Sequence, residues 1–287
     1  MAFSLALLVA TLAWLDPERL WNQFARAEPI WIAVGLCSAS LCFPLLAARW
    51  AFISTRAGAP LAFGRAIREY YVSTLLNQLL PLGVAGDAWR AKQRLDAERS
   101  AGPRRAALGA LVADRVSGQF VLWAWVLSAL PAFRQSLPRA HVSHLALALV
   151  LALGVAVALS RFERVREWLR AGAAVLFAPR SAVVHLPLSA ALIALHVATF
   201  WAAARALGLE LDLGTACHIV PLVLCAGSLP AFFAGWGVRE LAAAGLYHLS
   251  GRSSGDGATA SLLFGLLSLA ASAPGIFLHD RRDREQP

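Results

Sequence analysis

Two arginines stand at the ends of matching segments in a chain that is otherwise rich in apolar residues. The segments are LPLGVAGDAWR, residues 80–90, and LPAFFAGWGVR, residues 229–239, and both read L-P-x-x-x-A-G-x-x-x-R. A guanidinium keeps its charge and offers a planar fork of N–H donors that fits a pair of phosphate oxygens. Arg90 and Arg239 are therefore candidate binding residues for a phosphate group, although each could instead mark a membrane boundary.

Carboxylates accompany both arginines. Asp87 lies shortly before Arg90, and Glu240 follows Arg239 directly. These carboxylates can orient the arginine forks, provide a proton-sensitive site, or only neutralise a buried cation. The sequence leaves the three roles open, and we include Asp87 and Glu240 among the candidate binding residues.

Asp114 and Arg115 form a third candidate pair, inside the apolar run 106–130. At 1.5 Å of rise per residue they lie roughly 12 Å from the start of that run. Ionisable groups at this depth are costly unless they face protein or water. We predict that both residues line a polar cavity, and the alternative is structural pairing with another helix.

The rest of the chain must position these groups inside a membrane. It is 59% hydrophobic and 15% charged over 287 residues, and its charges are bunched between long apolar runs. Runs of about 20 residues can cross the hydrocarbon core as helices. The composition therefore predicts a polytopic all-α integral membrane protein, a single domain over residues 1–287, with about six full spans.

The net charge of +9 follows membrane topology. Cations gather in four regions, 49–68, 90–105, 161–180 and 281–284. By the positive-inside rule these regions, with the C-terminus, are expected on the cytoplasmic side of the cell inner membrane. The arginines lie in short loops and no long soluble segment is present, so we predict no nucleic-acid partner.

Two apolar runs do not fit as simple spans. Both flanks of run 70–86 are basic, so this run must enter the membrane and turn back. The run at 222–249 must likewise begin and end on the outer side. Proline breaks a helix and glycine allows a tight turn. We therefore predict re-entrant hairpins at residues 70–95 and 213–250, formed with the help of Asn77, Pro81, Gly86, Pro230, Gly235 and Gly237.

These two hairpins enter from opposite faces, and each contains one copy of the eleven-residue motif. Inverted repeats with broken helices that meet near the bilayer midplane recur among transporters, where helix N-termini face anionic groups. The sequence thus predicts an inverted repeat of two oppositely oriented hairpins.

Three blocks of the chain resemble a known family. NQLLPLGVAGDAWRA, ADRVSGQF and LPAFFAGWGVRELAAAGLY are similar, in order and spacing, to blocks of the lysylphosphatidylglycerol synthase transmembrane, or flippase-like, family. The resemblance implies a flippase-like fold and movement of a lipid between leaflets. We expect a stand-alone member without the soluble synthase domain, and therefore no synthase activity.

We accordingly predict a lipid translocator whose partner is an anionic or phosphate-bearing membrane lipid, with no catalytic residue, metal or cofactor. The chain lacks the ATP-binding G-x-x-x-x-G-K-[ST] loop and the hydrolase motifs G-x-S-x-G and H-E-x-x-H. Alternatives are a non-transporting partner of a glycosyl- or lipid-modifying enzyme and a transferase that uses Asp87 or Asp114 as base. An enzyme partner or a homo-oligomer is left open.

Overall fold

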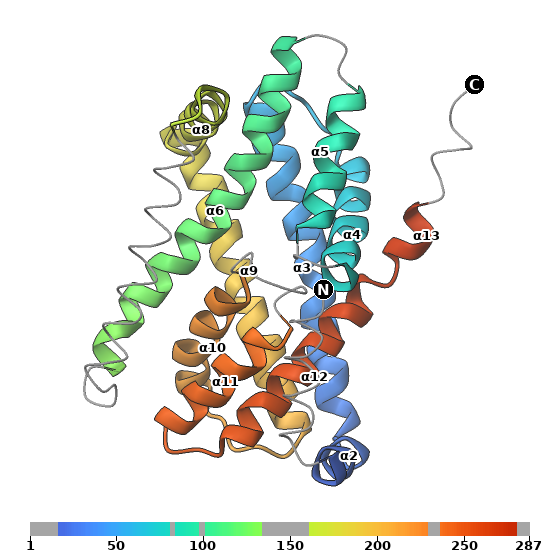
Figure 1. Ribbon diagram of the computed structural model, residues 1–287, viewed down its shortest axis with the longest axis vertical. Helices are drawn as coiled ribbons and strands as arrows, with labels where there is room; N and C mark the ends of the chain where they lie inside the picture. Colours follow the sequence, from blue (N-terminus) through green and yellow to red (C-terminus); the bar gives the residue numbers. More distant parts are fainter. Residues whose placement is uncertain (1–16, 81–83, 98–100, 134–160, 229–235, 280–287) are drawn as a thin grey trace. The chain divides into compact units, whose positions relative to one another are not determined.

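The computed structural model describes residues 17–80, 84–97, 101–133, 161–228 and 236–279. These residues form helices joined by short connections, with no strand among them (Figure 1). The all-α class predicted from composition is therefore confirmed. The helices are α2 (Pro17–Ala25), α3 (Pro29–Arg56), α4 (Phe63–Leu79), α5 (Ala85–Ala97), α6 (Ala101–Phe133), α8 (Glu163–Leu176), α9 (Pro179–Ala206), α10 (Leu213–Ser228), α11 (Val238–Leu249), α12 (Ser254–Ser272) and α13 (Gly275–His279).

Among the described residues, four stretches of helix are long and apolar enough to cross a membrane. They are Pro29–Arg56, Gly102–Ser128, Pro179–Ala206 and Ser254–Leu278. Two further apolar runs of the sequence, 1–15 and 142–160, lie outside the described residues. The membrane character of the protein is thus supported by its helices, and the number of spans stays a prediction.

Helix breaks coincide with the predicted hairpin turns. Helix α4 ends at Leu79 and α5 begins at Ala85, on either side of the first proline–glycine segment. Helix α10 ends at Ser228 and α11 begins at Val238, on either side of the second. Pro81, Pro230 and Gly235 themselves lie outside the described residues, and the depth at which each pair turns within a bilayer stays a prediction.

An internal repeat extends well beyond the eleven-residue motif. Helices α3 and α9 are both 28 residues long, and they begin at Pro29 and Pro179, which are 150 positions apart. Proline favours the first helical position because its missing N–H is unpaired there in any case. At the same spacing α4 begins at Phe63 and α10 at Leu213.

The two long helices also end in the same way. Gly58 and Gly208 both adopt the left-handed backbone region, with φ of 84° and 70°. The residue after each glycine donates its N–H five residues back, from Ala59 to Ser54 and from Leu209 to Ala204, at 2.9 and 3.0 Å. This glycine-terminated bonding pattern stops a helix and turns the chain. Both copies of the repeat therefore use the same turn before the broken helices.

Equivalent faces of α4 and α10 are buried. Positions 66, 69, 70, 73 and 75 are buried in α4, and the positions 150 residues later, 216, 219, 220, 223 and 225, are buried in α10. The residue types differ, because Glu69 and Tyr70 correspond to Ile219 and Val220. The repeat is consequently clearer in the positions that pack than in the residues that occupy them.

The described chain divides into two compact units. One contains residues 1–48, 63–90 and 190–287, and the other contains 49–62 and 91–189. In the first, α11 packs between α10 and α12 (Figure 1), and Gly257 of α12 lies so close to the Ala243 carbonyl and the Tyr247 ring that a Cβ would overlap them. In the second, α6 packs on α8 through glycines in the same way, because Gly109 faces Ala171 and Gly172 faces Ala113. Small residues of this kind let membrane helices approach closely.

Candidate functional site

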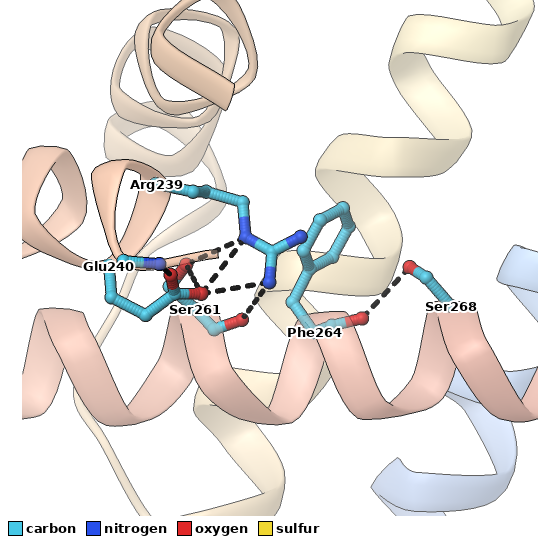
Figure 2. A network of polar contacts seen from close by, with 6 residues as sticks. Arg239, Glu240, Ser261, Phe264 and Ser268 are labelled. Atoms are coloured by element: carbon cyan, nitrogen blue, oxygen red, sulfur yellow. Dashed lines mark hydrogen bonds and ion pairs between the residues drawn. The ribbon is translucent and has the colours of Figure 1, made fainter. Parts of the chain in front are cut away.

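Arg239 lies in the first turn of α11, in a buried network that reaches α12 (Figure 2). Its Nε and Nη2 donate to Glu240 Oε1 at 3.1 and 2.8 Å. The same Nε lies 3.1 Å from Ser261 Oγ, which in turn donates to Glu240 Oε1 at 3.1 Å. Serine, arginine and glutamate thus form a closed triangle, so the guanidinium has a fixed orientation.

Glu240 also fixes the start of α11. Its Oε2 accepts a 2.6 Å hydrogen bond from the N–H of Gly237, the residue before the helix. A carboxylate three residues into a helix commonly returns to the N-cap amide in this way. Gly237 has a φ of 86°, a conformation that favours glycine. The same carboxylate therefore holds both the helix break and the arginine.

Aromatic rings and a glycine complete the surroundings of Arg239. Its guanidinium carbon lies 4.8 Å from the centroid of the Trp236 ring and 5.2 Å from that of Phe264. A Cβ at Gly265 would overlap Arg239 Nη2 and the Trp236 ring, so glycine leaves the space that the guanidinium fills. Nη1 points away from the carboxylate (Figure 2) and has no hydrogen-bond partner among the described residues. The Nη1 edge of the Arg239 guanidinium is therefore directed away from Glu240.

Arg90 has related surroundings in α5. It is buried, its guanidinium carbon lies 4.2 Å from the centroid of the Tyr70 ring, and its Nη1 lies 3.7 Å from Asp87 Oδ1. Tyr70 comes from α4, so the arginine joins the two arms of the first hairpin. A cation over an aromatic face is stabilised by the ring quadrupole, more so where water is excluded. Both motif arginines therefore combine a ring with a carboxylate, although their carboxylates come from different positions.

Asn77 and Gly86 hold the arms of the first hairpin together. Asn77 Oδ1 accepts a 2.7 Å hydrogen bond from the Gly86 amide. A Cβ at Gly86 would overlap the backbone carbonyl of Ser73, so any larger residue would separate α4 from α5. Asn77 supplies an acceptor beside the break, and Gly86 permits the close approach.

Asp114 lies in a different network, within the second unit. Its Oδ1 accepts a 3.1 Å hydrogen bond from Arg49 Nε of α3, and both side chains are buried. Gly118, one turn along α6, leaves room for the Arg49 guanidinium. The charge pattern places Arg49 in a cytoplasmic loop region, and this is wrong, because Arg49 lies within α3 as the partner of Asp114.

Arg115 lies on the exposed side of α6, whereas Asp114 is buried. Consecutive helical residues point about 100° apart, so one face cannot hold both. Asp114 and Arg115 therefore have different surroundings, with Asp114 and Gly118 on the Arg49 side.

Sequence reasoning missed Ser261, which contacts Arg239 and Glu240, and four buried residues of the second unit that hydrogen bonds join: Arg49, Ser117, His185 and Ser189. Arg49 stands inside the apolar run 30–53, which is the signal that marked Asp114 as unusual. The serines and the histidine carry no such signal, because isolated small polar residues are common in membrane helices.

A capping interaction outside the long spans gives a testable prediction. Asp212 Oδ1 accepts a 2.8 Å hydrogen bond from the Thr215 amide at the start of α10, and its Oδ2 lies 3.2 Å from Arg252 Nη2. Hydrogen bonds from the Thr215 side chain and amide, with a smaller effect of the Arg252 charge, lower the pKa of the Asp212 carboxyl below its ordinary value of 3.8. A carboxyl with a depressed pKa stabilises the fold above its ordinary pKa, and this contribution is lost as the pH falls through the folded-state value.

We expect Asp212→Ala to lower the free energy of unfolding by about 1 kcal/mol at neutral pH, as for other helix caps. Unfolding in mixed detergent micelles measures the change. The difference from the unmodified chain should shrink below about pH 4, where the carboxyl becomes protonated. An equal difference at both pH values would show that the capping charge contributes nothing.

Comparison with known families identifies the chain over nearly all its length. The model of the family described as lysylphosphatidylglycerol synthase TM region matches residues 1–275. The matched segment contains the three sequence blocks quoted above, together with Arg90 and Arg239. Comparisons with curated proteins and with solved structures gave no match.

Proposed function

Because the chain belongs to the lysylphosphatidylglycerol synthase transmembrane family, we propose that it moves a phosphate-bearing lipid between the leaflets of a bacterial inner membrane. The family gives the protein a membrane lipid-related role. The finer proposal is that this role is translocation and that the chain is not itself an enzyme. The motif arginines supply the headgroup site.

The observation that carries this proposal is the pair of buried arginines beside the helix breaks. Arg90 and Arg239 each lie over an aromatic ring and near a carboxylate. A buried cation in a membrane protein is costly, and such residues commonly mark substrate pathways. The carboxylate and the ring make the cation tolerable and fix its direction.

Arg239 is the better defined of the two. Its Nε and Nη2 face Glu240, whereas Nη1 has no hydrogen-bond partner among the described residues. Arg239 is also the second residue of α11, where the helix dipole is positive. A phosphate oxygen at Nη1 would gain a charge-assisted hydrogen bond and the attraction of the helix N-terminus.

In the proposed mechanism the headgroup phosphate binds at the broken helices while the acyl chains remain in lipid. The hairpins at residues 70–95 and 213–250 enter the bilayer from opposite faces, and the C-terminus is cytoplasmic. Asp87 and Glu240 orient the two guanidinium groups. We assign Asp114 to the Arg49 pair, which holds α3 against α6, and leave Arg115 as a cavity-lining candidate.

The test is movement of headgroup-labelled lipids in proteoliposomes that contain the purified chain. We expect the chain to speed the movement of anionic phospholipids well above the rate in protein-free vesicles. A neutral glycolipid without phosphate is the matched substrate control, and it should move at the protein-free rate.

If well-folded chain moves no lipid, the translocator proposal fails. Recovery of a stable complex with a glycosyl- or lipid-modifying enzyme in mild detergent would then favour the partner hypothesis. Turnover of an activated lipid or sugar donor by the purified chain would favour the transferase.

A further inference from the structure

A chain of hydrogen bonds runs through the second unit from Arg49 to a buried histidine. Arg49 Nη1 donates to Ser189 Oγ at 3.0 Å, and Ser189 Oγ lies 3.0 Å from Ser117 Oγ. Ser117 Oγ lies 2.9 Å from His185 Nδ1, and His185 Nε2 lies 3.0 Å from the Leu176 carbonyl oxygen. All four side chains are buried. Helices α3, α6, α8 and α9 each contribute one or more of these groups.

While His185 is neutral, the groups at the two ends fix the direction of every hydrogen bond. A carbonyl oxygen only accepts, so His185 Nε2 carries a hydrogen, and in the neutral ring Nδ1 is then an acceptor. Ser117 must donate to Nδ1, which leaves its oxygen to accept from Ser189. A guanidinium only donates, so Ser189 accepts from Arg49. The chain therefore points from Arg49 to His185, and no hydroxyl hydrogen is left over.

The same atoms also satisfy a second arrangement. If His185 gains a proton at Nδ1, that nitrogen donates to Ser117, and the Ser117 hydroxyl turns toward Ser189. Ser189 then accepts from both Ser117 and Arg49, and its own hydrogen turns to a carbonyl one turn back in its helix, a bond that serine commonly makes. Hydroxyl oxygens have two lone pairs, so every donor still has an acceptor. The chain of hydrogen bonds is therefore complete whether His185 is neutral or protonated.

Charge distinguishes these two arrangements. The charged groups linked to the chain are Arg49 of α3 and Asp114 of α6, which balance each other. The ionisable residues of α8 lie at 163–170, away from Leu176 at its end, and on α9 Arg180 is exposed. Arg56 of α3 is exposed too, and it donates to Ser181 Oγ at 3.3 Å, one turn before His185. Protonated His185 would add one positive charge near a buried pair. In that state Arg49 shares the Ser189 oxygen with Ser117, and the added positive charge is attracted to the Asp114 carboxylate.

A serine that donates to a histidine also resembles a nucleophile with its base. Ser117 and His185 are only 1% and 3% exposed, which leaves no access for an acyl substrate. A proton needs no such access. The geometry therefore favours proton binding over covalent catalysis.

We infer that His185 is a proton-binding site whose charge is transmitted through Ser117 and Ser189 to the Arg49–Asp114 pair. The ligand is a proton, and the groups that respond hold α3 against α6. This inference rests on the geometry of the second unit alone. It does not depend on lipid translocation.

Magnetic resonance of the chain in lipid nanodiscs, labelled with ¹⁵N in histidine and arginine, tests the inference. The His185 signals are identified by their loss in His185→Gln, with the partly buried His218→Gln as the matched control. Near pH 8 we expect a hydrogen on Nε2 and none on Nδ1. As the pH is lowered from about 8 to about 5, Nδ1 should gain a hydrogen and the Arg49 signals should shift in parallel.

A second variant tests whether the charge of His185 is transmitted to Arg49 along the hydrogen bonds. Ser117→Ala removes the link, so His185 should still gain its proton while the shift of the Arg49 signals is lost. Ser128→Ala is the control on the same helix, because its hydroxyl donates to the Trp125 carbonyl rather than to this hydrogen-bond chain, and it should keep the Arg49 shift. A hydrogen on Nδ1 near pH 8, a ring that stays neutral to about pH 5, or unchanged Arg49 signals would each overturn the inference. These three results are read in the unmodified chain, and His185→Gln serves only to identify the histidine signals, so the results hold even if Ser117→Ala fails to fold.

Discussion

Arg239→Lys is expected to slow translocation of a phosphate-bearing lipid by at least about tenfold while leaving the fold intact. Lysine keeps the positive charge beside Glu240, so the buried carboxylate retains a partner. It lacks the planar fork, so it cannot hold Glu240 with one edge and offer Nη1 to a phosphate with the other. A hydrogen bond to a charged group contributes about 1.5–3 kcal/mol. Loss of this amount in the transition state lowers a rate by about ten to about one hundred times.

The measurement is the leaflet-exchange rate of a headgroup-labelled anionic phospholipid in proteoliposomes, with thermal unfolding in detergent as the check on folding. Arg252→Lys is the matched control, because Arg252 also pairs with a carboxylate, Asp212, but outside the motif. It should translocate at the normal rate. A normal rate in Arg239→Lys would remove Arg239 from the headgroup site. If Arg239→Lys unfolds and Arg252→Lys does not, the guanidinium of Arg239 has a structural role instead.

The helix breaks could be predicted from sequence because proline and glycine act locally. Proline removes a backbone donor wherever it stands, and the topology argument required a turn at the same two places. Helix α4 accordingly ends two residues before Pro81, and α10 ends two residues before Pro230. The pairing of Arg239 with Glu240 is similarly local, since the residues are adjacent.

Contacts between distant segments could not be predicted in this way. Ser261 lies 22 residues from Arg239, and Asp114 lies 65 residues from Arg49. Nothing in a single sequence indicates which helix supplies the partner. The longer repeat was also hidden, because α4 and α10 preserve buried positions while exchanging Glu69 for Ile219 and Tyr70 for Val220. Packing requires a position to be filled, and several residue types can fill it in different surroundings.

Arg49 shows the limit of the charge rule. Positive residues are enriched in cytoplasmic loops, and counting them is effective when most cations are exposed. A cation whose partner is a buried carboxylate on another helix contributes nothing to topology. Arg49 pairs with Asp114, so its place in the sequence reports a helix contact rather than the side of the membrane.

Asp114→Leu is expected to destabilise the protein by about 3–5 kcal/mol, because removing one partner of a buried ion pair leaves the other charge uncompensated. Arg49→Met should have a similar cost for the same reason. The free energy of unfolding in mixed micelles measures both. Asp212→Ala, which removes an exposed carboxylate, is the control and should cost only about 1 kcal/mol.

The double variant Arg49→Met/Asp114→Leu separates a structural pair from a substrate site. With both charges replaced by apolar side chains, no buried charge is left unpaired, so much of the lost stability should return. If the pair only joins α3 to α6, the double variant should also translocate lipid within a few fold of the normal rate. Recovered stability without translocation would instead place Asp114 in contact with the lipid. A double variant as unstable as the sum of the two single ones would show that the 3.1 Å contact between Arg49 and Asp114 provides no coupling.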